Sequence, residues 1–285
     1  MESPSYPLKV GDVFMSLNDL EAIRKNFVAF NLPEIPKSEF DLSTLVPPAP
    51  RPKLPNGKNQ MVPAFVSLDL EADGDDRHPI VSGTDVVSVG MTIIGQVEVN
   101  GPLVVLANYE ASCDYANEEQ LELNVVKNKF WMVGDEPGEG WKRLVRGQRD
   151  RREVALEIQI LINELKNLGW SCHLFARPVG YDFRQIHGFF TSLGLHCPFG
   201  FGGAGGVTDM GQKVNAFQLC YGVPETSFNT VMKNVIGRDN LSHGGLQDAM
   251  DQLVTYMVIT DLIKRINANH DDRDRELLVN LLTVH

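Results

Sequence analysis

Short apolar runs bounded by turn residues predict three consecutive β-strands in the first half of the chain. Residues 64–70 form an apolar run of the length of a buried strand. Two longer runs of the same kind follow at residues 85–99 and 102–111. Because Asn100 and Gly101 between them favour a tight two-residue turn, we predict that these two runs pair as an antiparallel hairpin.

Helical spacing dominates the second half of the chain. Residues 150–168 carry apolar side chains at steps of three and four, which is the period of an amphipathic helix. Residues 170–176 have the pattern of a fourth strand, and further helices are predicted at residues 182–193 and 246–268. Strands followed by helix, strand and helices are typical of an α/β domain with a mixed sheet.

The N-terminal part is organised differently. Residues 1–31 contain one run with helical spacing, at 16–30. Residues 32–62 are crowded with proline, which lacks a backbone N–H and is typical of an extended connector. We therefore divide the chain into an N-terminal helical segment, a proline-rich connector and a folded domain at residues 63–285.

Composition indicates a soluble intracellular protein, cytoplasmic or nuclear, without membrane contact. The 285 residues, 43% of them hydrophobic, suffice for one substantial core. No apolar run reaches the roughly 18 residues that cross a membrane, and the N-terminus has no pattern of a secretion signal. The scattered cysteines favour free buried thiols over disulfides or a zinc site; they are Cys113, Cys172, Cys197 and Cys220.

The net charge of −11 argues against a protein that holds long duplex DNA through a broad basic face. It is compatible with a short, local grip on a nucleic-acid end, because bound metal ions can meet the phosphate groups.

Two acidic residues end the first predicted strand. Asp69 and Glu71 are two positions apart, so both carboxylates leave the same face of the sheet, where they could bind one hard divalent cation. Solvated acids in a turn are the simpler alternative. A calcium loop fits less well, because Ile80 stands where such a loop has its bidentate glutamate.

Three further candidates lie far downstream. Asp182 is placed where a predicted strand gives way to a helix, and a helix N-cap is its simpler interpretation. His243 precedes the last predicted helix, and Asp248 follows five residues later on its first turns. A lone histidine beside two glycines is more often a loop residue than a base.

Together these segments resemble the DEDDh 3′-to-5′ exonucleases, a family with an RNase H-like fold. The motifs, in family order, are FVSLDLEADG, VGYDF and HGGLQDA, and the resemblance covers about residues 60–265. It implies an α/β fold with a mixed five-stranded sheet flanked by helices. It also implies a phosphodiester hydrolase that trims single-stranded 3′ ends of DNA or RNA to nucleoside 5′-monophosphates, and a possible homodimer.

The resemblance assigns a role to each motif residue. Asp69, Glu71, Asp182 and Asp248 would bind two Mg²⁺ or Mn²⁺ ions, whose charge of +4 balances four carboxylates. His243 would act as the general base that takes a proton from the attacking water.

Substrate contacts are less clearly marked by the sequence. Leu70 and Phe183 are candidate walls for the terminal base and sugar, and both are equally compatible with a core role. Arg146 and Arg149 belong to the most basic stretch of the chain and are candidates for backbone contacts, with a solvated helix face as the alternative. Asp209 is interpreted as a helix cap.

Some features depart from the family pattern or favour other functions. Residues 177–181, which precede Asp182, differ from the histidine or asparagine and small residues of many relatives. A module that binds nucleic acid without cleaving it is the main alternative. A dinucleotide-binding enzyme is a third, based on Gly200, Gly202 and Gly205, but no clear strand precedes these glycines. Nothing in the sequence distinguishes DNA from RNA.

Overall fold

The computed structural model describes most of the predicted folded domain and a few residues before it. The described residues are 8–10, 13–15, 42–51, 53, 59–72, 86–99, 101, 103–114, 132–133, 136–137, 147–177, 179–200, 206–223, 226–237, 245–269 and 272–283. The predicted helix at 16–30 lies outside them. So do His243, Arg146 and most of the glycine-rich loop.

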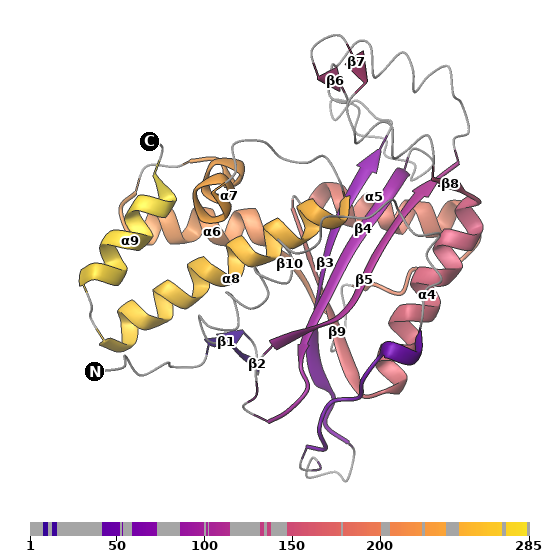
Figure 1. Cartoon of the computed structure of the whole chain (residues 1–285), viewed down its shortest axis with the longest axis horizontal. Coiled ribbons are helices and arrows are strands. Elements are labelled where there is room, and N and C mark those ends of the chain that lie inside the picture. Colours follow the sequence, from indigo (N-terminus) through magenta and orange to yellow (C-terminus); the bar gives the residue numbers. More distant parts are fainter. Residues whose placement is uncertain are drawn as a thin grey trace.

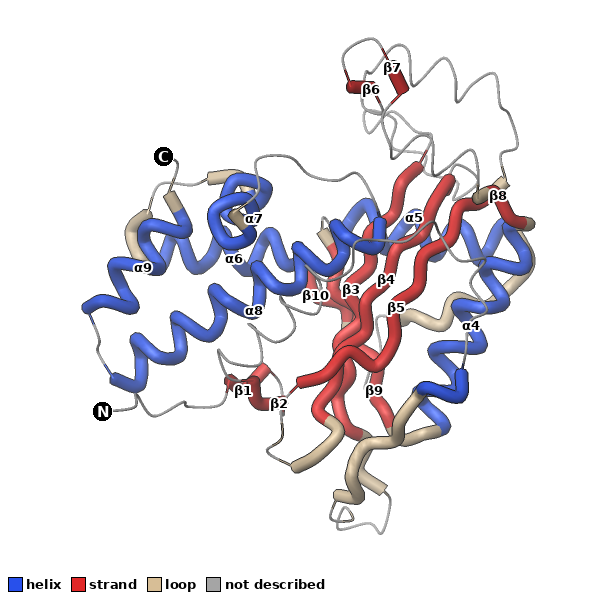
Figure 2. Tube along the Cα trace, viewed as in Figure 1, coloured by secondary structure: helices blue, strands red, loops and turns tan. Residues whose placement is uncertain are grey.

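A six-stranded mixed sheet forms the centre of the fold (Figures 1 and 2). Its order is β10-β9-β3-β4-β5-β8, with β3, β4 and β5 antiparallel and the remaining pairs parallel. The strands are β3 (Val62–Ala72), β4 (Val86–Gln96), β5 (Leu103–Cys113), β8 (Gln148–Arg149), β9 (Trp170–Ala176) and β10 (Val207–Asp209).

The α/β class, the mixed sheet and the predicted hairpin are thereby confirmed, but the sheet has six strands in the described part of the chain, not five. The edge strands β8 and β10 are two and three residues long. Segments this short have too few positions to show an alternation of apolar and polar side chains, so the sequence pattern does not reveal them.

Helices cover both faces of the sheet (Figures 1 and 2). On one face α4 and α5 pack against the strands, and on the other α8 lies on the sheet with α6, α7 and α9 around it. The helices are α4 (Arg151–Asn167), α5 (Val179–Ser192), α6 (Met210–Cys220), α7 (Phe228–Ile236), α8 (Gly245–Asn269) and α9 (Asp272–Leu282). No helix within the described ranges is both long and apolar enough to cross a membrane.

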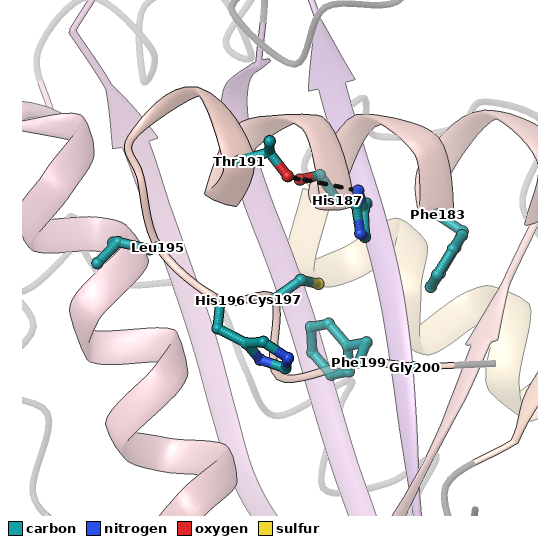
Figure 3. Close-up of a pocket in the computed structure, with 8 residues that line it drawn as sticks. All are labelled: Phe183, His187, Thr191, Leu195, His196, Cys197, Phe199 and Gly200. Atoms are coloured by element: carbon teal, nitrogen blue, oxygen red, sulfur yellow. Dashed lines mark hydrogen bonds between the residues drawn. The ribbon is translucent and has the colours of Figure 1, made fainter. Parts of the chain in front are cut away.

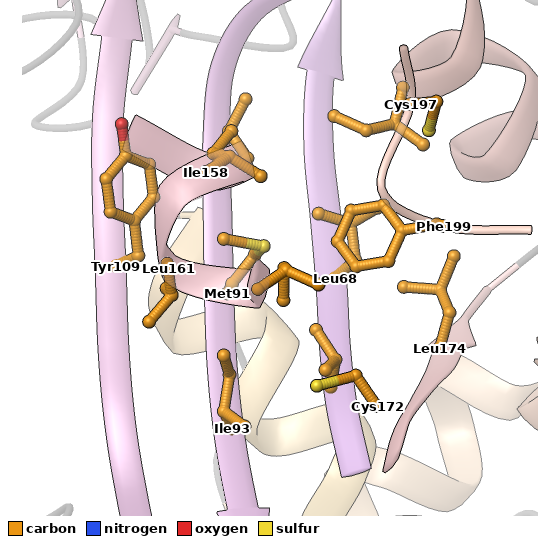
Figure 4. Close-up of a cluster of buried hydrophobic side chains, with 14 of the residues drawn as sticks. Leu68, Met91, Ile93, Tyr109, Ile158, Leu161, Cys172, Leu174, Cys197 and Phe199 are labelled. Carbon is orange, nitrogen blue, oxygen red and sulfur yellow. The ribbon is translucent and has the colours of Figure 1, made fainter. Parts of the chain in front are cut away.

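Side-chain alternation along β3 divides the core into two layers. Leu68 belongs to the cluster formed with α4 and α5, which also contains Met91 and Ile158 (Figure 4). Phe65 belongs to the cluster formed with α8. Since side chains two residues apart share a face, Asp69 points to the α8 side of the sheet. Burial on both faces explains why β4 is apolar almost throughout.

Local signals determine where the helices begin. Asp150 caps α4 and accepts hydrogen bonds from the backbone N–H groups of Arg152 and Glu153. The helix therefore begins where the sequence pattern predicted it, at about residue 150. Helix α5 begins at Val179, one turn before the predicted start, so Asp182 lies in the first turn and is not the N-cap. An acid there is still favoured by the helix macrodipole.

Part of the proline-rich connector is held against the sheet. A single 3₁₀ turn, Leu42–Thr44, is followed by extended chain, and the Ala49 backbone N–H donates to the Val97 carbonyl at 2.6 Å. The Trp170 indole donates to the Val46 carbonyl at 2.9 Å. This stretch of connector therefore satisfies hydrogen bonds of the folded domain.

Smaller elements lie outside the main sheet. β1 (Leu8–Val10) pairs with β2 (Val13–Met15), and β6 (Met132–Val133) pairs with β7 (Glu136–Pro137). All four cysteines are free, as predicted; three are buried, and Cys220 is exposed, which corrects the expectation for that residue.

Candidate metal centre

Asp69 and Glu71 project from the end of β3 that extends past its neighbour. β9 pairs with β3 only as far as Ser67, so the last part of β3 has one strand neighbour instead of two. Glu71 is buried and Asp69 is partly exposed. The acids therefore stand at an open corner of the sheet, on the α8 side.

Two glycines bring the third acid to this corner. A Cβ atom on Gly90 of β4 would lie 1.8 Å from the Gly245 carbonyl carbon, and one on Gly245 would lie 2.9 Å from the Gly90 nitrogen. The first turn of α8 thus touches the backbone of β4 at the position paired with Asp69. Asp248 lies in that first turn and is buried.

The three carboxylates form a compact group. One potential ligand oxygen from each of Asp69, Glu71 and Asp248 lies within 4.8 Å of the others. Ligands on opposite sides of a Mg²⁺-sized ion are about 4.2 Å apart, so the group fits one hard cation with little movement. A metal ion could be held here, as the sequence predicted for these three residues.

Asp182 of α5 lies near these three carboxylates but is not one of the three whose ligand oxygens lie within 4.8 Å of one another. Its Oδ2 accepts the backbone N–H of Arg177 at 3.0 Å, and the Leu70 backbone N–H also donates to it. The side chain therefore spans the ends of β9 and β3. Its charge raises the pKa of Glu71, which places it close to the other acids.

Burial and mutual repulsion raise the pKa values of Asp69, Glu71 and Asp182, so these three acids hold protons strongly when no cation is bound. Burial, and then the charge of Asp248, raise the pKa of Asp69 to about 8, although a hydrogen bond from Gln252 lowers it. Burial and the neighbouring acids raise the pKa of Glu71 well above its ordinary value. Burial and Asp69 do the same for Asp182. A bound divalent cation would replace those protons.

Two residues of the site were not identified from sequence. Gln252 donates from Nε2 to Asp69 Oδ1 at 2.7 Å, and its Oε1 is buried without a hydrogen-bond partner. Its position four residues after Asp248, on the same helix face, was the available signal. Arg177 contacts Asp182 through its backbone, and its charge lowers the pKa of Asp69.

The candidate substrate residues have structural surroundings of their own. Leu70 and Phe183 are both buried members of the core cluster beside α4 and α5. Both terminal guanidinium nitrogens of Arg149 donate to the Glu157 carboxylate, Nη1 at 2.8 Å. Asp209 caps α6 by accepting from the Gln212 N–H at 2.9 Å, as predicted.

A surface pocket of about 290 Å³ lies beside α5 (Figure 3). The buried Phe183, Cys197 and Phe199 border it, with His187 and His196 at its exposed edge. Burial raises the pKa of the Cys197 thiol to about 11, so this thiol is protonated at neutral pH.

Comparison with models of known protein families gave no match, and comparison with curated proteins gave none either.

Proposed function

We propose that this protein is a metal-dependent 3′-to-5′ exonuclease with an RNase H-like fold, acting on single-stranded ends of DNA or RNA. The observation that carries the proposal is the group of three carboxylates on β3 and α8 within 4.8 Å of one another. The order of the three sequence motifs supports the same function. Asp182 supplies a fourth acid beside the group.

The charge and number of the acids favour two Mg²⁺ or Mn²⁺ ions. Four carboxylates carry −4 when deprotonated, and burial makes that charge costly unless cations compensate it. Oxygen ligands suit these hard cations. Such ions would supply Lewis-acid stabilisation of the charge that develops on the phosphate.

The protein groups have separate tasks in this proposal. Asp69, Glu71 and Asp248 would hold the cations together with Asp182 from α5. Gln252 orients the Asp69 carboxylate through its 2.7 Å hydrogen bond. His243 accepts the proton of the attacking water, a role proposed from its place in the third motif alone.

The test is a cleavage assay that shows from which end the strand is shortened. The full chain is incubated with 5′-labelled single-stranded DNA or RNA and Mg²⁺, Mn²⁺ or EDTA. We expect shortening from the 3′ end with metal, none in EDTA, and a loss of at least about 100-fold in Asp69→Asn, Asp248→Asn and His243→Ala. Asp261→Asn is the matched control, because Asp261 is a buried acid of the same helix outside the group.

Two outcomes would contradict the proposal. Cleavage that persists in EDTA, or that is equally active in Asp69→Asn, would exclude these carboxylates as the catalytic centre. Binding of the oligonucleotide without any shortening would favour the nucleic-acid-binding module instead.

A further inference from the structure

Arg177 lies beside the candidate metal centre, on the same side of the sheet. It directly follows β9, in which Phe175 pairs in parallel with Ser67 of β3. This is the last pair of the two strands, and Arg177 and Asp69 each lie two residues beyond it. Phe175 belongs to the core on the α8 side, so Arg177 leaves the same face. The Asp182 carboxylate accepts the backbone N–H groups of both Arg177 and Leu70, so Arg177 lies near the end of β3 that carries Asp69. The charges of Arg177 and Asp69 accordingly affect each other's pKa.

The guanidinium group is held in place from two sides. Its Cζ lies 4.8 Å from the centre of the Phe228 ring, and Nη1 donates to Asn229 Oδ1. Both of these residues belong to the first turn of α7. Gly211 lies alongside the Arg177 side chain, because a Cβ there would be in ordinary contact with Arg177 Cγ at 3.5 Å. A cation held in this way loses little conformational entropy when it binds a ligand.

The acids around Arg177 come from three elements. Asp69 on β3, Asp182 on α5 and Asp209 at the end of β10 all stabilise its charge, against the cost of its partial burial. If divalent cations neutralise the metal-binding carboxylates, much of this negative charge is compensated. An anion bound between the metal-binding carboxylates and Arg177 would then be attracted both by the metal ions and by the guanidinium group.

We propose that Arg177 binds a phosphate oxygen of the substrate next to the metal-binding carboxylates, so that the site selects phosphate esters by charge as well as by metal coordination. The planar guanidinium donates hydrogen bonds in the fixed geometry that suits phosphate. The inference rests on the proposed function for the presence of metal, and it adds a substrate-binding residue outside the five motif residues.

The test measures two equilibria without turnover. Mn²⁺ binding and, with Mn²⁺ present, binding of thymidine 5′-monophosphate are measured by calorimetry for the full chain and for Arg177→Met. We expect the variant to bind Mn²⁺ about threefold more tightly, because a nearby cation is removed. It should bind the nucleotide about 10- to 100-fold more weakly, because a charged hydrogen bond is lost. Arg177→Lys should retain part of the nucleotide affinity.

Arg265→Met is the control for a general loss of stability. Arg265 is also a partly buried arginine, but it pairs with Asp274 between α8 and α9. This variant should lower the melting temperature and leave both affinities unchanged.

Opposite changes in the two affinities of Arg177→Met support the proposal, because a purely structural role would lower both together. Unchanged nucleotide binding, or parallel losses that follow the melting temperature, would overturn it. If no exonuclease activity is found but the opposite changes occur, the phosphate site stands and the proposed function fails. If the exonuclease is active and Arg177→Met binds nucleotide normally, only this inference fails.

Discussion

Gly90 is a point at which α8 touches the sheet, and its replacement by alanine tests how the candidate metal centre is assembled. The added Cβ would lie 1.8 Å from the Gly245 carbonyl carbon and 2.0 Å from the Leu246 nitrogen. Both atoms belong to the backbone, so no change of side-chain rotamer can relieve the clash. An ordinary contact begins at 3.4 Å, so the first turn of α8 must retreat by about 1.6 Å.

That displacement is large compared with the dimensions of the site. The ligand oxygens, now within 4.8 Å of one another, would spread to about 6 Å when Asp248 moves with its helix. One Mg²⁺-sized ion spans only about 4.2 Å between opposite ligands. We expect Gly90→Ala to weaken Mn²⁺ binding at least about 100-fold. Overpacking should lower the free energy of unfolding by about 1–3 kcal/mol.

The assay is thermal unfolding with and without saturating Mn²⁺, combined with calorimetric titration of the metal. Gly245→Ala should show a smaller loss, because its Cβ would lie 2.9 Å from the Gly90 nitrogen. Gly95→Ala is the matched control in the same strand. Its Cβ would press on Trp170 and Leu106 side chains at 2.7 and 2.8 Å, far along β4 from the acids. It should lower stability but keep Mn²⁺ binding.

A folded Gly90→Ala variant that binds Mn²⁺ with the affinity of the parent chain would show that the contact between Gly90 and Gly245 does not position Asp248. Equal losses of Mn²⁺ affinity in Gly90→Ala and Gly95→Ala would contradict the prediction too, because they would show a general effect of overpacking rather than displacement of Asp248.

Three further predictions concern protons, positioning and the connector. In EDTA the free energy of unfolding should fall as pH rises from about 4 to 8, because folding raises the pKa of Asp69 from 3.8 to about 8 and the folded state holds a proton that the unfolded state releases. Thermal unfolding of Asp69→Asn should depend less on pH. An identical pH dependence in the variant would contradict the pKa assignment. Gln252→Met removes the hydrogen bond to Asp69 and should weaken Mn²⁺ binding about tenfold in calorimetry, with little change in melting temperature. Trp170→Phe leaves the Val46 carbonyl without its donor and should cost about 1–3 kcal/mol in urea unfolding, whereas no change would mean that the connector does not stabilise the domain.

The predicted elements agree best with the structure where the pattern is local and repeats. Residues 64–70 lie within β3, residues 170–176 match β9, and residues 150–168 correspond to α4. In each case the period of apolar positions is a property of the segment itself, because it reflects which side chains share a face. The two short edge strands and the earlier start of α5 have no such repeating signal.

Spacing along the sequence marked the acids as candidates, and the order of the three motifs, through the family resemblance, assigned them to one site. Whether Asp248 meets Asp69 and Glu71 was decided by tertiary structure, through the backbone contact of Gly90 with Gly245. The neighbourhood of Arg177, with contacts from α5 and α7, was decided in the same way. Spacing along the chain determines which face a side chain occupies. Distances between residues more than a hundred positions apart depend on how closely the backbones pack.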